Sequence, residues 1–137
     1  MNILKMTLLL SALLSGVAMA DISVVVNPAN ANAVSADDLS RLFLGRASSF
    51  ADGSKATPLN LTEGLAAREE FDSKVLSRSG SQLKAYWSKL VFTGKGTPPK
   101  ELADDAAVKA AVASDASAIG YISSASVDGS VKVVATF

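Results

Sequence analysis

The feature that most constrains the fold is the run Ile22–Val26, in which every residue except Ser23 is apolar and β-branched. A continuous run of this kind, without polar alternation, is typical of a strand that is buried on both faces. It ends at Asn27-Pro28, which favours a turn. A strand covered on both faces predicts a layered α/β structure, with helices packed on a small mixed sheet.

The remainder of the chain alternates between helical periodicity and short extended runs, in the order β-α-β-α-α-α-β-β. Thr62 is the expected N-cap of the second helix, and 56–61, which contains Pro58, is expected to be an edge or short strand. Phe50 is the expected aromatic anchor of a loop that turns at Asp52-Gly53. The predicted elements after the first strand are a helix between the cap Ser35 and the stop Gly45, a strand at 56–61, helices at 63–76, 81–91 and 104–114, and strands at 118–123 and 130–136 joined by a turn at Asp128-Gly129.

Residues 1–20 have the pattern of a cleavable secretory signal peptide. Lys5 supplies a positive charge, Met6–Leu14 is apolar apart from Thr7 and Ser11, and Ala18-Met19-Ala20 is a small-residue cleavage site. The alternative is a retained N-terminal anchor, although the apolar run is too short to span a bilayer. We therefore expect cleavage after Ala20, a periplasmic location, and a single domain at residues 21–137 with no later membrane span.

Composition excludes several classes of function. The chain has no cysteine and no histidine, so disulfides, the usual zinc, copper and iron sites, and Ser-His-Asp or Cys-His catalysis are all absent. Removal of Lys5 leaves 12 basic and 13 acidic side chains, which gives no reason to expect a nucleic-acid surface. Acidic residues at the helix starts complement the helix dipole, and no calcium loop is present. We expect a protein that is not an enzyme, with no catalytic residues, no metal and no cofactor.

Several motifs occur together in an order that is characteristic of one family. They are VVVNP at 24–28, LSRLFLGRASSFADG at 39–53, REEF at 68–71, AYWSKLVFTG at 85–94, PP at 98–99 and AIGYI at 118–122. The set resembles the periplasmic phosphate-binding proteins of ABC transporters, and in particular their small one-domain members. The resemblance implies a single lobe of a type II periplasmic-binding-protein-like fold. A complete receptor of this family has two such lobes, with the anion in the cleft between them.

The resemblance also indicates where a ligand would bind. In the family this lobe contributes an arginine and a Ser-Gly-Thr run at a helix N-terminus, where N–H groups, hydroxyls and the helix dipole hold phosphate. Here the arginine position is Leu61, and the Ser-Gly-Thr positions are Leu65, Ala66 and Ala67. The donors that remain near this helix start are Thr62, Gly64 and Arg68, which we take as the candidate anion-binding residues.

Each candidate also has a structural interpretation. Arg68 has the spacing to pair with Asp72 on the same helix, and Thr62 suits a helix cap. Tyr86 and Trp87 recur with Leu83, Leu90 and Val91 at helical spacing, which favours packing over ligand stacking. Tyr121 is expected to pack, and the loop Gly94–Thr97 lacks the frame of a phosphate loop.

Two hypotheses for function follow from the sequence. The first is a periplasmic phosphate- or anion-binding module in uptake or sensing, whose ligand is phosphate or another small oxyanion. The second is an interaction module that has kept the fold and lost the ligand, and that binds an envelope partner such as a sensor kinase, a porin or a transporter. Self-association that rebuilds a cleft is also open.

Overall fold

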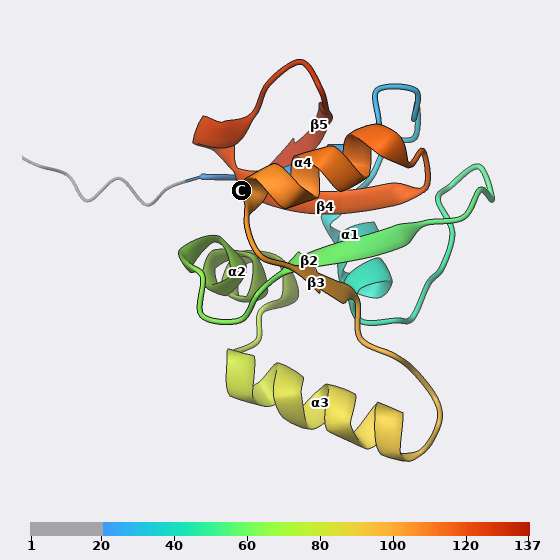
Figure 1. The fold of residues 1–137 in the computed structure, drawn as a ribbon. Helices are drawn as coiled ribbons and strands as arrows, with labels where there is room; N and C mark the ends of the chain where they lie inside the picture. Colours follow the sequence, from blue (N-terminus) through green and yellow to red (C-terminus); the bar gives the residue numbers. More distant parts are fainter. Residues whose placement is uncertain (1–20) are drawn as a thin grey trace, which may run out of the picture.

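The computed structural model describes residues 21–137; the predicted signal peptide at 1–20 lies outside the described residues. A five-stranded mixed sheet, in the order β3-β2-β4-β1-β5, forms the centre of the molecule (Figure 1). The elements, in chain order, are β1 (Ile22–Val26), α1 (Ala36–Phe43), β2 (Thr57–Leu61), α2 (Ala66–Phe71), the π-helical turn η1 (Asp72–Leu76), α3 (Gly80–Phe92), β3 (Lys100–Leu102), α4 (Asp105–Ser114), β4 (Ala118–Ser123), the 3-10 turn η2 (Ser124–Ser126) and β5 (Lys132–Thr136). Within residues 21–137, no helix has both the length and the apolar character that crossing a membrane requires.

The first strand lies inside the sheet, as its composition predicts. All five residues of Ile22–Val26 are buried, and the strand pairs antiparallel with β4 on one side and β5 on the other. The backbone groups of Ile22 and Phe137 exchange hydrogen bonds of 3.0 and 2.9 Å. The two ends of the described chain therefore meet at one edge of β1.

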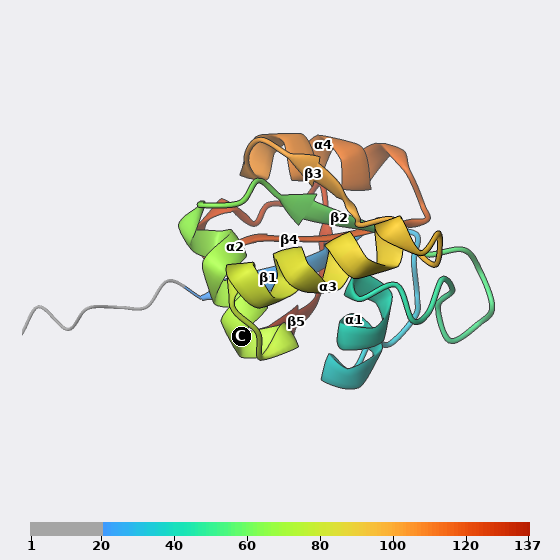
Figure 2. The same cartoon turned by 90° about the horizontal axis from the view of Figure 1, so that it is seen from below.

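Helices cover both faces of the sheet, and β4 shows how the two layers are built. Gly120 faces α4, where an added Cβ would come within 2.8 Å of Val108 Cγ1. The next residue, Tyr121, points to the opposite face, where its ring stacks on Phe71 at 3.9 Å and lies 5.9 Å from Phe43. Helix α4 thus packs on one face, while α1 and α2 pack on the other (Figures 1 and 2). The glycine is needed for the close approach of α4.

Helix α1 and the loop after it follow the sequence closely. The Ser35 hydroxyl accepts from the Asp38 backbone N–H, and the Asp38 carboxylate accepts from the Ser35 N–H, which completes a capping box. Gly45 ends the helix with φ +72°, a conformation that glycine adopts without strain. Phe50 is 5% exposed and anchors the loop as predicted.

One prediction about the strands, the edge position of 56–61, is wrong. The strand at 56–61 was expected to be an edge or short strand, but β2 lies between β4 and β3 and is not an edge. Pro58 is tolerated because β2 pairs with β4 only at Thr57 and Pro58, and then with β3 from Leu59 onward. The edge on this side of the sheet is β3, which the sequence did not reveal because a strand of three residues is too short to show an alternating pattern. Strands β4 and β5 do not pair with each other, because β1 lies between them.

The second helix begins later than predicted. Its N-cap is Leu65, so α2 starts at Ala66, and Thr62 is not a cap. The Thr62 hydroxyl instead donates to the carbonyl of Leu102 at 3.0 Å, and Gly64 has φ +93° in the turn that precedes the helix. Thr62 is bonded to β3 and does not cap the helix, so α2 starts later than predicted.

Helix α3 lies beyond the sheet edge formed by β3 (Figure 1), and its apolar face is narrower than predicted. Ser79 caps it with Gln82 in a second capping box. Leu83 and Trp87 are buried, but Val91 is 54% exposed and Phe92 is 92% exposed. The end of the helix therefore projects beyond the core.

Candidate functional site

The strands β2 and β4 separate at their carboxyl ends, and Tyr121 fills the opening. The backbone N–H of Leu61 donates to the Tyr121 hydroxyl at 3.2 Å, and that hydroxyl donates to Asn60 Oδ1. Burial raises the pKa of the Tyr121 hydroxyl far above its ordinary value, so it remains a protonated donor. In parallel sheets, ligands bind beyond the carboxyl ends of the strands. Here a side chain of the fold closes that opening.

Arg68 is held in a buried network immediately beside this opening. Its Nε lies 3.0 and 3.2 Å from the two carboxylate oxygens of Asp72. Its Nη1 donates to the carbonyl of Leu61 at 2.8 Å and to Glu101 Oε1 at 3.0 Å. The side chains of Arg68 and Asp72 are only 9% and 6% exposed. Two carboxylates therefore already neutralise the guanidinium.

Burial beside Arg68 destabilises the charged form of the Asp72 carboxyl. Burial raises its pKa above the ordinary value, and the attraction of Arg68 opposes that rise. A buried carboxylate needs a compensating cation, because transfer from water costs several kcal/mol per ion. Arg68 therefore has a structural task that competes with ligand binding.

The three candidate anion-binding residues do not line one common cavity. Arg68 reaches the groove described below, but neither Thr62 nor Gly64 lines that groove. The Thr62 hydroxyl is engaged with Leu102, and Gly64 is exposed in the turn before α2. None of the three lines the hollow at the start of α2.

The helix start itself forms a separate hollow, of about 420 Å³. The four positions that the resemblance aligns with the family's arginine and Ser-Gly-Thr run all line this hollow. Opposite them are the carboxylates of Asp104 and Asp105, at the start of α4. The hollow is lined by Leu61, Leu65, Ala66, Ala67, Ala103, Asp104, Asp105 and Ala106. Its only charged groups are acidic, and they disfavour an anion there.

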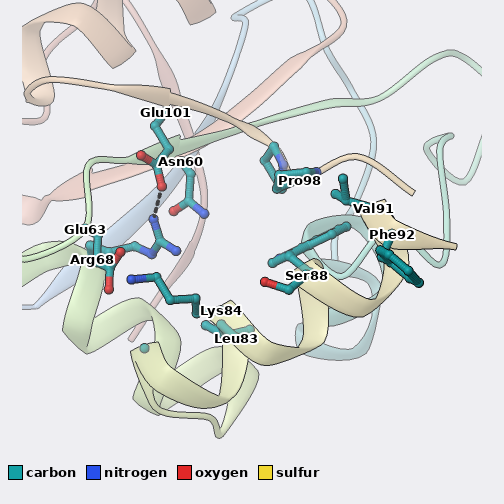
Figure 3. Close-up of a pocket in the computed structure, with 13 residues that line it drawn as sticks. Asn60, Glu63, Arg68, Leu83, Lys84, Ser88, Val91, Phe92, Pro98 and Glu101 are labelled. Carbon is teal, nitrogen blue, oxygen red and sulfur yellow. Dashed lines mark hydrogen bonds and ion pairs between the residues drawn. The ribbon is translucent and has the colours of Figure 1, made fainter. Parts of the chain in front are cut away.

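A larger groove, of about 540 Å³, lies between α3 and the edge of the sheet, and we refer to it as the α3 groove. One end is polar, with Arg68, Glu63 and Lys84 close together; the other end is apolar, with Val91, Phe92 and Pro98 (Figure 3). Leu83 and Trp87 contribute from α3, and Asn60 and Glu101 contribute from β2 and β3. The polar end holds cations and carboxylates in similar number.

Sequence reasoning missed most of this groove. It identified Arg68 and assigned Trp87 to packing; Trp87 is 9% exposed and also lines the groove. It missed Glu101, which comes from an unpredicted strand 33 residues after its partner Arg68. Phe92 carried a usable signal, because it lies at the last helical position before a Gly/Pro-rich loop.

Two solved structures resemble the chain along most of its length. An ABC-type phosphate transport receptor from Vibrio cholerae matches with a TM-score of 0.66 and 20% identity, over 85% of this chain and 46% of the receptor. A protein from Clostridium perfringens, described as a phosphate ABC transporter substrate-binding protein with bound phosphate, matches with a TM-score of 0.65 and 17% identity, over 85% of this chain and 45% of that protein. No protein-family model and no curated protein sequence matches the chain.

These matches confirm the fold that the motifs implied. The chain has a phosphate-binding-protein-like fold, and its mixed sheet with packed helices corresponds to a single lobe of a periplasmic-binding-protein-like structure. It spans less than half the length of the two proteins that it matches. At this level of identity the likeness concerns the fold.

Proposed function

We propose that the protein is an interaction module of the cell envelope that has kept the fold of a phosphate-receptor lobe without its anion site. The observation that carries this proposal is the state of Arg68. Its guanidinium is neutralised by Asp72 and Glu101 and bound to the Leu61 carbonyl, so the best sequence candidate for an anion contact serves the fold.

The hollow at the start of α2 supports the same proposal. Phosphate sites at helix starts combine backbone N–H groups with hydroxyl or cationic side chains. Here Leu65 and Ala67 replace the hydroxyl donors, and Asp104 and Asp105 add negative charge. An oxyanion would lose its water and gain little in return.

The periplasm is the compartment we propose for this module, since the N-terminal sequence has a secretory pattern and the structural neighbours are transport receptors and substrate-binding proteins. Binding rather than catalysis is the proposed activity. Whether the partner belongs to an uptake or a sensing system depends on the identity of that partner.

The second candidate is weak binding of phosphate or a similar oxyanion at the polar end of the α3 groove. One observation favours it: Arg68 Nη2 makes no hydrogen bond within residues 21–137, and Lys84 lies nearby (Figure 3). Glu63 and Glu101 line the same end, which lowers the attraction for an anion. Thr62 and Gly64 could contribute only if the turn before α2 moved.

Calorimetric titration with phosphate, and with sulfate as control, tests the choice directly. We expect no saturable heat from residues 21–137 at low salt with up to millimolar anion. Micromolar phosphate binding would overturn the proposal, and its loss in Lys84→Ala would assign the site to the α3 groove. Lys55→Ala is the matched control, because Lys55 is also exposed and lies outside the groove.

A further inference from the structure

The charged side chains that line the α3 groove divide into a closed network and two free groups. Arg68 is paired with Glu101, which also lines the groove, and with Asp72. The remaining charged groups of the lining are Lys84 and Glu63, which are both exposed. Neither forms an ion pair with any residue in 21–137. The polar end therefore offers one free charge of each sign.

Two nearly buried side chains also present unused N–H donors at the polar end. Asn60 is 6% exposed and Arg68 is 8% exposed, and both line the groove. The Tyr121 hydroxyl accepts from the Leu61 N–H and donates to Asn60 Oδ1, so the Asn60 amide nitrogen is left for the groove (Figure 3). Among residues 21–137, neither Asn60 Nδ2 nor Arg68 Nη2 has a hydrogen-bond partner, and no fully buried side-chain polar atom lacks one. Both nitrogens are therefore accessible, and they suit an acceptor group such as a carboxylate.

The wall beside these polar groups is apolar. Leu83 and Trp87 are one turn apart on α3, on either side of Lys84 in the sequence, and both line the groove. Val91 and Pro98 continue this lining toward the other end (Figure 3). A concave site of several hundred Å³, with apolar walls and a few convergent polar groups, is typical of small-molecule binding. The α3 groove, of about 540 Å³, has these properties.

The balance of charge at the polar end selects the class of ligand. A ligand with a net negative charge is attracted by Lys84 but repelled by Glu63 and Glu101. A ligand with a net positive charge is attracted by Glu63 but repelled by Lys84. A zwitterion places its carboxylate at the N–H donors and its ammonium at Glu63, so that both free charges gain a partner. An α-amino acid carries these two groups on one carbon atom, as a site with both charges at one end requires.

We propose that the α3 groove binds a free α-amino acid with a large apolar side chain. The carboxylate accepts from Lys84 and from the two unused N–H donors, the ammonium donates to Glu63, and the side chain lies against Trp87. This inference goes beyond the proposed function, because it assigns a ligand to a groove that is separate from the hollow at the start of α2. It holds with or without a protein partner.

Trp87 provides a direct test, because it is the only tryptophan in the chain and it lines the groove. Residues 21–137 are titrated with L-phenylalanine and with L-leucine while tryptophan fluorescence is recorded, and calorimetry provides a second measurement. The controls are 3-phenylpropionate, which lacks the ammonium, 2-phenylethylamine, which lacks the carboxylate, and L-serine, which lacks the apolar side chain. We expect a saturable signal with both apolar amino acids, and at least about tenfold weaker binding of each control.

Variants of the two free charges locate the site and identify the role of each. Glu63→Gln should weaken phenylalanine binding about tenfold without weakening that of 3-phenylpropionate, because only the amino acid uses the carboxylate of Glu63. Lys84→Gln should weaken phenylalanine binding by a similar factor without weakening that of 2-phenylethylamine. Glu69→Gln and Lys89→Gln are the matched controls, since both residues are exposed, lie on α2 and α3, and do not line the groove. Urea unfolding of each variant verifies the fold.

Four results would overturn the inference. The first is no saturable signal with either apolar amino acid in fluorescence and calorimetry. The second is equal binding of either single-charge control, and the third is binding that Glu63→Gln and Lys84→Gln leave unchanged. The fourth is equal binding of N-acetylphenylalanine amide, which would show that the groove takes an internal peptide segment and would make it a surface for the proposed partner. None of these results refutes the proposed function, for which the phosphate titration is the separate test.

Discussion

At the scale of single residues, the buried pair Arg68–Asp72 links the stability of the fold to the proposed function. Removal of one partner leaves a buried charge uncompensated, which costs about 3–5 kcal/mol, whereas removal of both is often nearly neutral. We expect Arg68→Met to lose about this amount of unfolding free energy in urea, and Arg68→Met with Asp72→Leu to recover most of it. Equal stability of the single and double variants would show that the pair is not a structural unit.

The pH dependence of the same variants checks the cause. A buried carboxyl whose pKa is raised in the folded state binds a proton more readily folded than unfolded, so stability increases as pH falls through that raised pKa toward about 4. Without Arg68 the pKa of Asp72 rises further, because the attraction of the guanidinium no longer opposes the effect of burial. The stability deficit of Arg68→Met should therefore shrink as pH falls from 7 toward about 4, and the double variant should show no such change.

This residue also shows what the sequence could predict about the site. The spacing of Arg68 and Asp72 predicted their pairing, because it depends only on helix geometry. The burial of the pair and the second carboxylate, Glu101, depend on how β3 docks beside β2, which local spacing does not encode. The same limit applies to Thr62, whose partner Leu102 also comes from β3.

At the scale of elements, the start of α1 offers a measurable contribution. The Ser35 N–H lowers the pKa of Asp38 most, and the Ser35 and Arg41 side chains lower it further. A depressed carboxyl pKa stabilises the fold above its unfolded value near 3.8, and that contribution is lost as pH falls through the folded value. Ser35→Ala should cost about 1 kcal/mol at pH 7, measured by urea unfolding.

Asp38→Asn removes this titrating group, so the free energy of unfolding should decrease less on acidification than it does in wild type. Asp37→Asn is the matched control, since it removes the same charge from the same helical turn without a capping contact. A steeper loss of stability on acidification in Asp38→Asn than in wild type would contradict the assignment.

Elements with strong local signals were predicted well, and those defined by pairing were not. The run Ile22–Val26, the cap Ser35 and the helix at 104–114 have their own chemistry, and the structure has them within a residue or two. Strand β3 and the late start of α2 depend on each other, because Thr62, in the turn before α2, donates to the carbonyl of Leu102 in β3. The segment 73–100 has six basic side chains and no acidic one, a feature of the sequence that the near-zero net charge of the whole chain hides.

At the scale of the whole molecule, the pairing of β5 with β1 covers the outer edge of the most apolar strand. Strand β1 comes first in the described chain but pairs with the last two strands, so its second edge is covered only when β5 docks. An uncovered, Val-rich edge is a template for pairing between chains. Deletion of residues 131–137 should therefore give a protein that aggregates on refolding, measured by light scattering and soluble yield.

The control for this deletion keeps β5 and removes only side-chain burial, as in Val131→Ala, which truncates a residue that is 7% exposed. We expect it to lower stability while the protein stays monomeric, because the backbone pairing of Val24 and Val25 with β5 remains. If the deleted chain instead refolded as a soluble monomer, β1 would be protected by α2 and α4 alone. The sheet edge at β5 would then be a second candidate surface for the proposed partner among residues 21–137, besides the α3 groove.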